Sequence, residues 1–146
     1  MKTSVIFVCV HNSARSQMAE AFLKQLCCDQ CTIESAGLEP GSLNPLVVKA
    51  MAEVGIDISQ NQTKGALDLF KAGRTFRHVI TVCDQESGER CPIFPLVLQR
   101  HHWSFPDPGE LTGTEEEKLV EIRKIRDSIK EQVQQFYEEF CALAVS

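Results

Sequence analysis

The chain has 146 residues, with 15 Lys or Arg against 20 Asp or Glu, which gives a net charge of −5. Its hydrophobic content of 43% excludes an intrinsically disordered chain. No apolar run approaches the ~18 residues that a transmembrane helix needs. The mild acidity argues against nucleic-acid binding, because proteins bind phosphate backbones through basic stripes. We therefore expect one domain over residues 1–146, located in the cytoplasm, with no membrane or nucleic-acid partner.

Apolar patterns typical of strands alternate with patterns typical of helices along the chain. Continuous or short β-branched and aromatic runs predict four strands, at 4–10, 32–36, 78–83 and 102–105. Apolar residues at three- and four-residue steps predict helices at 16–26 and 45–54, and a long helix that follows a capping box at Thr114 and Glu117 and extends to Phe140. This order predicts an α/β fold of three layers, a four-stranded and mostly parallel sheet flanked by helices.

Seven cysteines without a secretory signal argue for reduced thiols rather than a disulfide framework. Three of them, Cys27, Cys28 and Cys31, lie close together in the sequence. A zinc site would need two further ligands at a matching spacing, and the chain offers none. We therefore expect these three to be thiols near a helix end, with an alternative redox role left open, and we expect no bound metal.

A cysteine and an arginine separated by five residues stand between the first predicted strand and the first predicted helix, in the sequence CVHNSARS of residues 9–16. Backbone N–H groups of a tight loop and of a helix start converge there and can bind an oxyanion. Arg15 adds a planar, two-pronged donor that suits a tetrahedral dianion. The same positive field stabilises the thiolate of Cys9, and Ser16 is placed to hydrogen-bond its sulfur. The expected oxyanion-binding residues are Val10, His11, Asn12, Ser13, Ala14, Arg15 and Ser16.

Asp107 lies between two prolines, Pro106 and Pro108. Proline has a fixed φ, so the aspartate is restrained by its neighbours, as a general acid must be. The alternative is an ordinary turn aspartate. Together with the Cys9 loop, the sequence favours the role of general acid.

Residues 9–20, CVHNSARSQMAE, resemble the active-site loop of thioredoxin-coupled arsenate reductases, which are built on the low-molecular-weight protein tyrosine phosphatase fold. The likeness extends over nearly the whole chain, through ESAG at 34–37, GIDIS at 55–59, VITVC at 79–83, CP at 91–92 and HWSFPDP at 102–108. The resemblance implies that Cys9 attacks the oxyanion, that Arg15 and the loop amides bind it, and that Asp107 protonates the departing oxygen.

The anion cradle does not distinguish arsenate from phosphate, but a reductase needs further thiols. Cys83 ends a predicted strand beside the one that ends at Cys9, so the two thiols can meet. Cys91 follows eight residues later, which is ~12 Å away if the segment is helical, whereas a disulfide tolerates at most ~7 Å between Cα atoms. A Cys83–Cys91 bond therefore requires unwinding; the alternative is two structural thiols. The resemblance implies a Cys9–Cys83 disulfide that is relayed to Cys83–Cys91 and reduced by thioredoxin.

A low-molecular-weight protein tyrosine phosphatase that forms a Cys9 phosphoenzyme is the main alternative function. Such phosphatases usually follow the acid with tyrosines that stack the substrate ring, but here Gly109, Glu110 and Leu111 follow, and the only tyrosine is Tyr137. A small inorganic anion, arsenate or phosphate, is the better fit. A redox-sensing or oxyanion-binding protein without turnover is a third possibility. The reductant can equally be a glutaredoxin and glutathione couple, and a monomer is the default expectation.

Some members of the family that the chain resembles bind potassium through an Asn, a Glu, a Ser and an Asp. Asn12, Glu20 and Ser35 match the first three, but Gly65 stands at the fourth position. We therefore expect no potassium site, and we expect Lys64 to supply the positive charge there.

Overall fold

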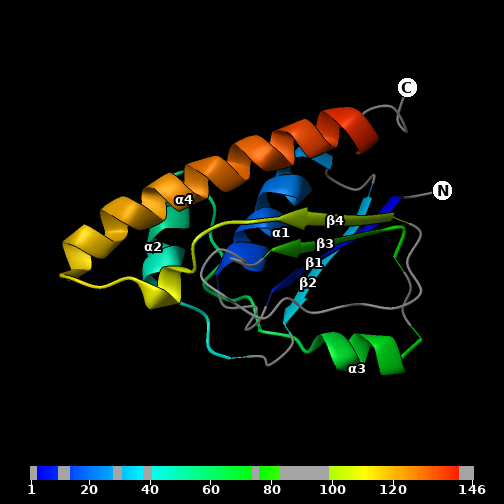
Figure 1. Cartoon of the computed structure of the whole chain (residues 1–146), viewed down its shortest axis with the longest axis horizontal. Helices are drawn as coiled ribbons and strands as arrows, with labels where there is room; N and C mark the ends of the chain where they lie inside the picture. The colour runs from blue at the N-terminus through cyan, green and yellow to red at the C-terminus, as the bar shows by residue number, and fades with distance from the viewer. Residues whose placement is uncertain are drawn as a thin grey trace.

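The computed structural model describes residues 3–9, 14–27, 31–37, 41–73, 76–82 and 99–141 (Figure 1). The strands in these ranges are β1 (Thr3–Cys9), β2 (Cys31–Gly37), β3 (His78–Val82) and β4 (Gln99–Trp103). The helices are α1 (Arg15–Cys27), α2 (Pro45–Ala52), α3 (Ala66–Lys71) and α4 (Glu115–Phe136), with a 3₁₀ turn, η2 (Pro108–Glu110), and a π-helical turn, η3 (Tyr137–Cys141).

The strands form a four-stranded sheet in the order β2-β1-β3-β4, and each neighbouring pair is parallel. The predicted α/β fold with a four-stranded parallel sheet is thereby confirmed. The chain leaves β1 toward β2 on one side and returns to β3 on the other, so the connections after β1 and β3 diverge. Open parallel sheets bind ligands at the carboxyl ends of the strands where such a divergence occurs. Cys9 and Val82 are the last residues of the two strands concerned.

β1 is buried on both faces because its side chains alternate between two apolar clusters. Val5 and Phe7 belong to the cluster that contains residues of α1, α2 and α4. Ile6 and Val8 point the other way and pack with Ala66 of α3. Figure 1 shows the same arrangement, with α1, α2 and α4 on one face of the sheet and α3 on the other. Complete burial of each such side chain stabilises the fold by about 1.5–3 kcal/mol, and it fixes the position of Cys9 at the end of the strand.

α4 begins with the predicted capping box: the Thr114 side chain accepts from the backbone N–H of Glu117, whose carboxylate accepts from the backbone N–H of Thr114. The helix buries Ile122, Ile129 and Val133 against the larger cluster. It ends at Phe136 and continues as η3, whereas the sequence predicted one regular helix to Phe140. Within the described ranges, no helix is both long and apolar enough to cross a membrane.

Two further elements differ from the prediction. The strand expected at 102–105 is β4, which begins three residues earlier at Gln99; it lies at the edge of the sheet, where Gln99 and Arg100 are exposed, so its start shows no apolar pattern. α3 was not predicted, because six residues are too few to show a helical period. The ends of two predicted strands, Val10 and Cys83, lie outside the described residues.

Candidate active site

The Cys9 thiol lies at the point where β1 ends and the connection to α1 begins. Cys9 is 3% exposed, and its Sγ lies 2.8 Å from the Oγ of Ser16, in the first turn of α1. The hydrogen bond expected from the sequence is therefore present. It places the sulfur beside the start of α1, where backbone N–H groups have no partner within the helix and the helix dipole is positive.

The connection itself is described only at its end. Ala14 is buried, and its carbonyl accepts from the N–H of Met18 in the first turn of α1. The other predicted oxyanion-binding residues lie outside the described residues; they are Val10, His11, Asn12 and Ser13.

Arg15 joins the start of α1 to the segment that follows β4. Its side chain is 3% exposed, and Nη1 donates to the carbonyl oxygen of Phe105 at 3.0 Å. Nη2 lies 3.7 Å from Oδ2 of Asp107, which is near enough for charge attraction but too far for a hydrogen bond. The buried guanidinium therefore brings the segment with Asp107 to the same end of α1 as Cys9.

The carboxylate of Asp107 is held by the backbone two residues further along the chain. Its Oδ1 accepts from the N–H of Gly109 at 2.9 Å, which caps η2, and Pro108 next to it is buried. The other carboxylate oxygen faces Arg15 and the side chain is 19% exposed, so solvent reaches it. One oxygen is thus fixed by a backbone N–H and the other lies near Arg15 on a partly exposed side chain, which suits a group that delivers a proton to a bound anion.

The carboxyl end of β4 is anchored by Trp103. Trp103 is 8% exposed, and its ring centroid lies 5.6 Å from that of Phe7 in β1. Asp107 follows this anchor by four positions in the sequence. The sulfur follows β1 and the carboxylate follows β4, so both lie at the carboxyl ends of the strands.

The two further cysteines expected to act with Cys9, Cys83 and Cys91, lie outside the described residues. The strand that leads to Cys83 is described: β3 lies next to β1 and parallel to it, with Val8 paired to Thr81. Of the three cysteines near the end of α1, Cys27 and Cys31 are thiols and Cys28 lies outside the described residues.

Glu20 lies on α1, five residues after Arg15, and is 5% exposed. Its Oε1 accepts from Ser35 Oγ at 2.5 Å, and its Oε2 lies 2.7 Å from the ammonium of Lys24. The sequence pointed to Lys64 as a source of positive charge here. Its Nζ lies 3.5 Å from Oε1 of Glu34, and Lys64 lines one groove together with Glu20 and Lys24, so this stays a prediction. The carbonyl oxygen of Lys64 accepts from the backbone N–H of Gly37, at the end of β2.

The residues around Glu20 do not fit a potassium ion. Both carboxylate oxygens already have a donor or cation, and Gly65 has no side chain that can act as a ligand. In the part of the chain that is described, no three His, Cys, Asp or Glu side chains are grouped so as to hold a metal ion.

Sequence reasoning missed two contacts around the site. The Phe105 carbonyl that accepts from Arg15 is 90 residues away in the chain, and no local pattern indicates such a pair. The Glu20–Lys24 pair did have a signal, because a Glu four residues before a Lys on a helix is a favourable ion pair.

Residues 4–143 match the low molecular weight phosphotyrosine protein phosphatase family. The arsenate reductase of Bacillus licheniformis is 43% identical over 140 residues, which cover 94% of this chain and 96% of that relative. Among solved structures, an arsenate reductase in the phosphate binding state has a TM-score of 0.74 and 31% identity, covering 95% of this chain and 98% of its own.

A thioredoxin-dependent arsenate reductase from Corynebacterium glutamicum is also similar, with a TM-score of 0.58 and 29% identity, covering 92% of this chain and 63% of that one. These matches agree with the fold described above. The chain belongs to the low molecular weight phosphotyrosine protein phosphatase family and, within it, to the arsenate reductases.

Proposed function

We propose that this protein reduces arsenate to arsenite, with Cys9 as the nucleophile and with Cys83 and Cys91 as the thiols that remove the oxidising equivalents. The observation that carries the proposal is the convergence of a buried sulfur, a buried guanidinium and a restrained carboxylate at the start of α1. The similarity to arsenate reductases over nearly the whole chain supports the choice of arsenate as the substrate.

In the first step arsenate binds at the start of α1 beside Arg15, and the Cys9 thiolate attacks arsenic. A sulfur–arsenic bond forms and an arsenic–oxygen bond breaks. Asp107 gives its proton to the departing oxygen, which leaves as water. The hydrogen bond between Cys9 and Ser16 holds the sulfur beside the positive end of α1 before the attack.

In the second step the Cys83 thiolate attacks the sulfur of Cys9. A disulfide forms, the sulfur–arsenic bond breaks, and its electron pair stays on arsenic, so that As(V) becomes As(III) and arsenite leaves. β1 and β3 are adjacent and parallel, and the register pairs Val8 with Thr81, so Cys83 comes one residue after the position opposite Cys9. Adjacent strands lie about 4.8 Å apart and a residue rises ~3.3 Å, so an offset of one residue stays within the Cα separation of at most ~7 Å that a disulfide tolerates. Because successive side chains of a strand point to opposite faces, the attack requires the segment after Val82 to turn Cys83 toward Cys9. Cys83 directly follows Val82, the last residue of β3.

In the third step the Cys91 thiolate attacks Cys83, which releases the Cys9 thiolate and leaves a Cys83–Cys91 disulfide. A dithiol reductant then supplies two electrons and returns both cysteines to thiols. We propose thioredoxin as this reductant, supported by the thioredoxin-dependent relative, and the cytoplasm as the place, since thiols are kept reduced there. The described site is built from one chain, so we propose that a monomer suffices.

Hydrolysis of phosphomonoesters is the second candidate, because Cys9, Arg15 and Asp107 alone are enough for a phosphoenzyme mechanism and one similar structure is in a phosphate binding state. The residues after the acid argue against an aryl substrate. Pro108 is buried, and Gly109, Glu110 and Leu111 provide no aromatic ring. Tyr137 lies at the far end of α4.

The test follows arsenite and NADPH with reduced protein, arsenate, thioredoxin and thioredoxin reductase. We expect turnover that both Cys83→Ser and Cys91→Ser abolish. In a single turnover without thioredoxin, Cys91→Ser releases about one arsenite per chain and Cys83→Ser releases none, because only the second step needs Cys83. Cys31→Ser, at the start of β2, is the matched control and keeps full turnover.

Two results would overturn parts of this proposal. Fast hydrolysis of an aryl phosphate that is insensitive to Cys83→Ser, without arsenite production, would identify a phosphatase. Turnover supported by glutaredoxin and glutathione but not by thioredoxin would replace the reductant and leave the first two steps unchanged.

A further inference from the structure

The helix whose start forms the proposed oxyanion site, α1, also carries a buried carboxylate. Glu20 lies five residues after Arg15 on α1, which is about 7.5 Å along the helix axis. It is 5% exposed, so solvent and salt screen its charge poorly. A negative charge at this place opposes a dianion at the start of the helix. It also costs free energy to bury unless a cation is beside it.

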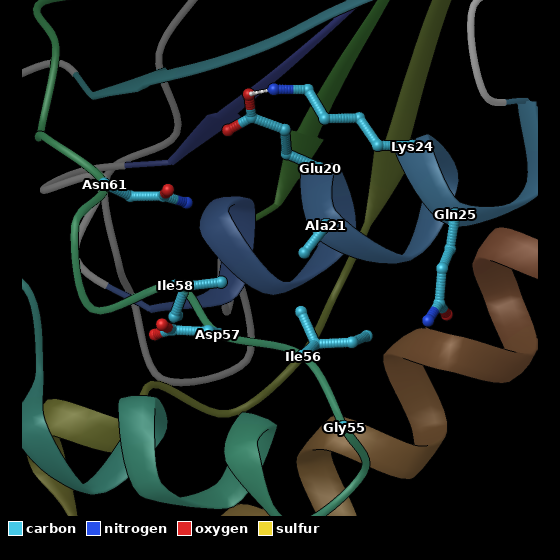
Figure 2. Close-up of a pocket in the computed structure, with 9 residues that line it drawn as sticks. All are labelled: Glu20, Ala21, Lys24, Gln25, Gly55, Ile56, Asp57, Ile58 and Asn61. Atoms are coloured by element: carbon cyan, nitrogen blue, oxygen red, sulfur yellow. Dashed lines mark ion pairs between the residues drawn. The ribbon is translucent and has the colours of Figure 1, made fainter.

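The cation beside Glu20 is the ammonium of Lys24, one turn further along the same helix. Nζ of Lys24 lies 2.7 Å from Oε2 of Glu20, while Oε1 accepts from Ser35 Oγ at 2.5 Å. Figure 2 shows the two side chains extended toward each other on one side of α1, with the ion pair between them. The carboxylate is thus held by a hydroxyl from β2 and neutralised by α1 itself.

The surroundings of this pair leave room for water and small ions. Glu20 and Lys24 line a groove of about 400 Å³ between α1 and the segment after α2, and a second groove of about 240 Å³ that reaches Lys64. Asn61 lines both grooves, and its Nδ2 donates to Gln17 on α1. A free cation can therefore reach Glu20 from solvent when the lysine is removed.

We propose that Lys24 is a positioning residue for oxyanion binding: its ammonium neutralises Glu20 within the chain, so that the start of α1 binds a dianion without a free monovalent cation. This rests on the oxyanion site of the proposed function, but on none of its disulfide steps. The Lys24 ammonium takes the place that a separate cation would otherwise hold, in agreement with the poor fit of the residues around Glu20 to potassium.

The test measures binding of inorganic phosphate to the reduced protein by calorimetry, in N-methylglucamine chloride and in potassium chloride at equal ionic strength. We expect wild-type protein to bind equally in both salts. Lys24→Met is expected to bind about tenfold more weakly in N-methylglucamine, which is about 1.4 kcal/mol, and to recover in potassium chloride. Lys24→Arg keeps the charge and is expected to stay near the wild-type affinity.

Two further variants separate charge balance from a merely structural role. The double variant Glu20→Gln/Lys24→Met has neither charge, so it is expected to bind phosphate like wild type in both salts. Lys124→Met is the matched control: it removes a lysine from an exposed helical ion pair with Glu121, far along the chain on α4, and is expected to change nothing. If Lys24→Met does not fold, Glu20→Gln alone still tests the proposal, because it is expected to bind phosphate at least as tightly as wild type.

The proposal is overturned if Lys24→Met binds phosphate normally in N-methylglucamine, if wild-type protein itself needs potassium, or if the double variant is as weak as Lys24→Met. None of these results depends on thioredoxin or on Cys83. If wild-type protein turns over arsenate but Lys24→Met binds phosphate normally, only the proposed role of Lys24 is rejected. If the phosphate data are as expected but wild-type protein does not reduce arsenate, only the proposed reductase activity is rejected.

Discussion

Two contacts between arginine and carboxylate in this molecule differ in how closely the charges approach. Between α4 and the end of α2, Arg123 makes a two-pronged contact with Glu53 at 2.6 and 2.9 Å, and Arg126 reaches the same carboxylate at 3.0 Å. At the start of α1, Arg15 lies 3.7 Å from Asp107 and its Nη1 is bonded to a backbone carbonyl instead.

The difference separates a contact that holds two helices together from a contact at the proposed anion site. Glu53 is saturated by two guanidinium groups, and the hydrogen bond from Arg123 lowers its pKa from 4.5 to about 2. Arg15 and Asp107 are kept close without a hydrogen bond between them, so both can turn toward an oxyanion placed in the same region. The hydrogen-bonded contacts of Glu53 fix the end of α2 against α4.

The largest effect should come from exchanging arginine for lysine at the two places. Arg15→Lys keeps the charge but loses the planar fork, so we expect kcat/KM for arsenate to fall about 10²–10³-fold. Arg123→Lys should leave kcat/KM unchanged, because the partner of Arg123 is Glu53, at the end of α2, and neither residue belongs to the site around Cys9. The thioredoxin-coupled assay measures both. Equal losses in the two variants would show that the comparison is mistaken.

Asp107→Asn should have the next largest effect and should separate chemistry from binding. The amide has no proton to give, so kcat should fall about 10²-fold. Inhibition by inorganic phosphate should stay equal or become tighter, because a negative charge 3.7 Å from Arg15 has been removed. A parallel loss of kcat and phosphate affinity would instead assign Asp107 to anion binding.

On the α4 side the effect should fall on stability alone. Arg126 is 8% exposed, and its Nη1 donates to the carbonyl of Ala50 as well as to Glu53. Arg126→Met leaves that carbonyl without its donor, so we expect the free energy of unfolding to drop by about 1–3 kcal/mol. Arg123→Met, which removes an exposed guanidinium, should cost less. Urea unfolding measures both, and a reversed order would contradict the assignment.

The comparison also shows what the sequence can predict. The strands at β1 and β3 are continuous apolar runs because both faces of each strand are covered, and that pattern is visible in the residues alone. The candidate nucleophile and arginine were found because they follow a predicted strand and precede a predicted helix.

Contacts between distant segments gave no such signal. The bond from Arg15 to the Phe105 carbonyl and the burial of Arg126 on a mostly charged helix depend on how the elements pack. The polar start of β4 was missed since an edge strand has one neighbour and tolerates exposed side chains. Lys24 was not named as a cation beside Glu20, although the two residues are four apart on one helix.

The smallest effect should be a pH dependence of the saturated pair. The pKa of Glu53 is about 2 in the fold and 4.5 as its ordinary value, so its contribution to stability is present above pH 4.5 and is lost as the pH falls toward 2. His78 acts in a higher range: burial lowers its pKa from 6.5 to about 4, so the fold prefers the neutral ring and loses stability from pH 6.5 downward to 4.

The Glu53→Gln variant keeps His78, so the difference in stability between this variant and the wild-type protein reports the Glu53 carboxylate alone. We expect wild-type protein to be the more stable of the two at pH 6, and we expect the gap between their urea midpoints to narrow as the pH falls below 4.5. A gap that is constant from pH 6 to pH 3 would mean that Glu53 acts through packing rather than charge. The α4 contact would then differ from the Arg15 site by its geometry alone.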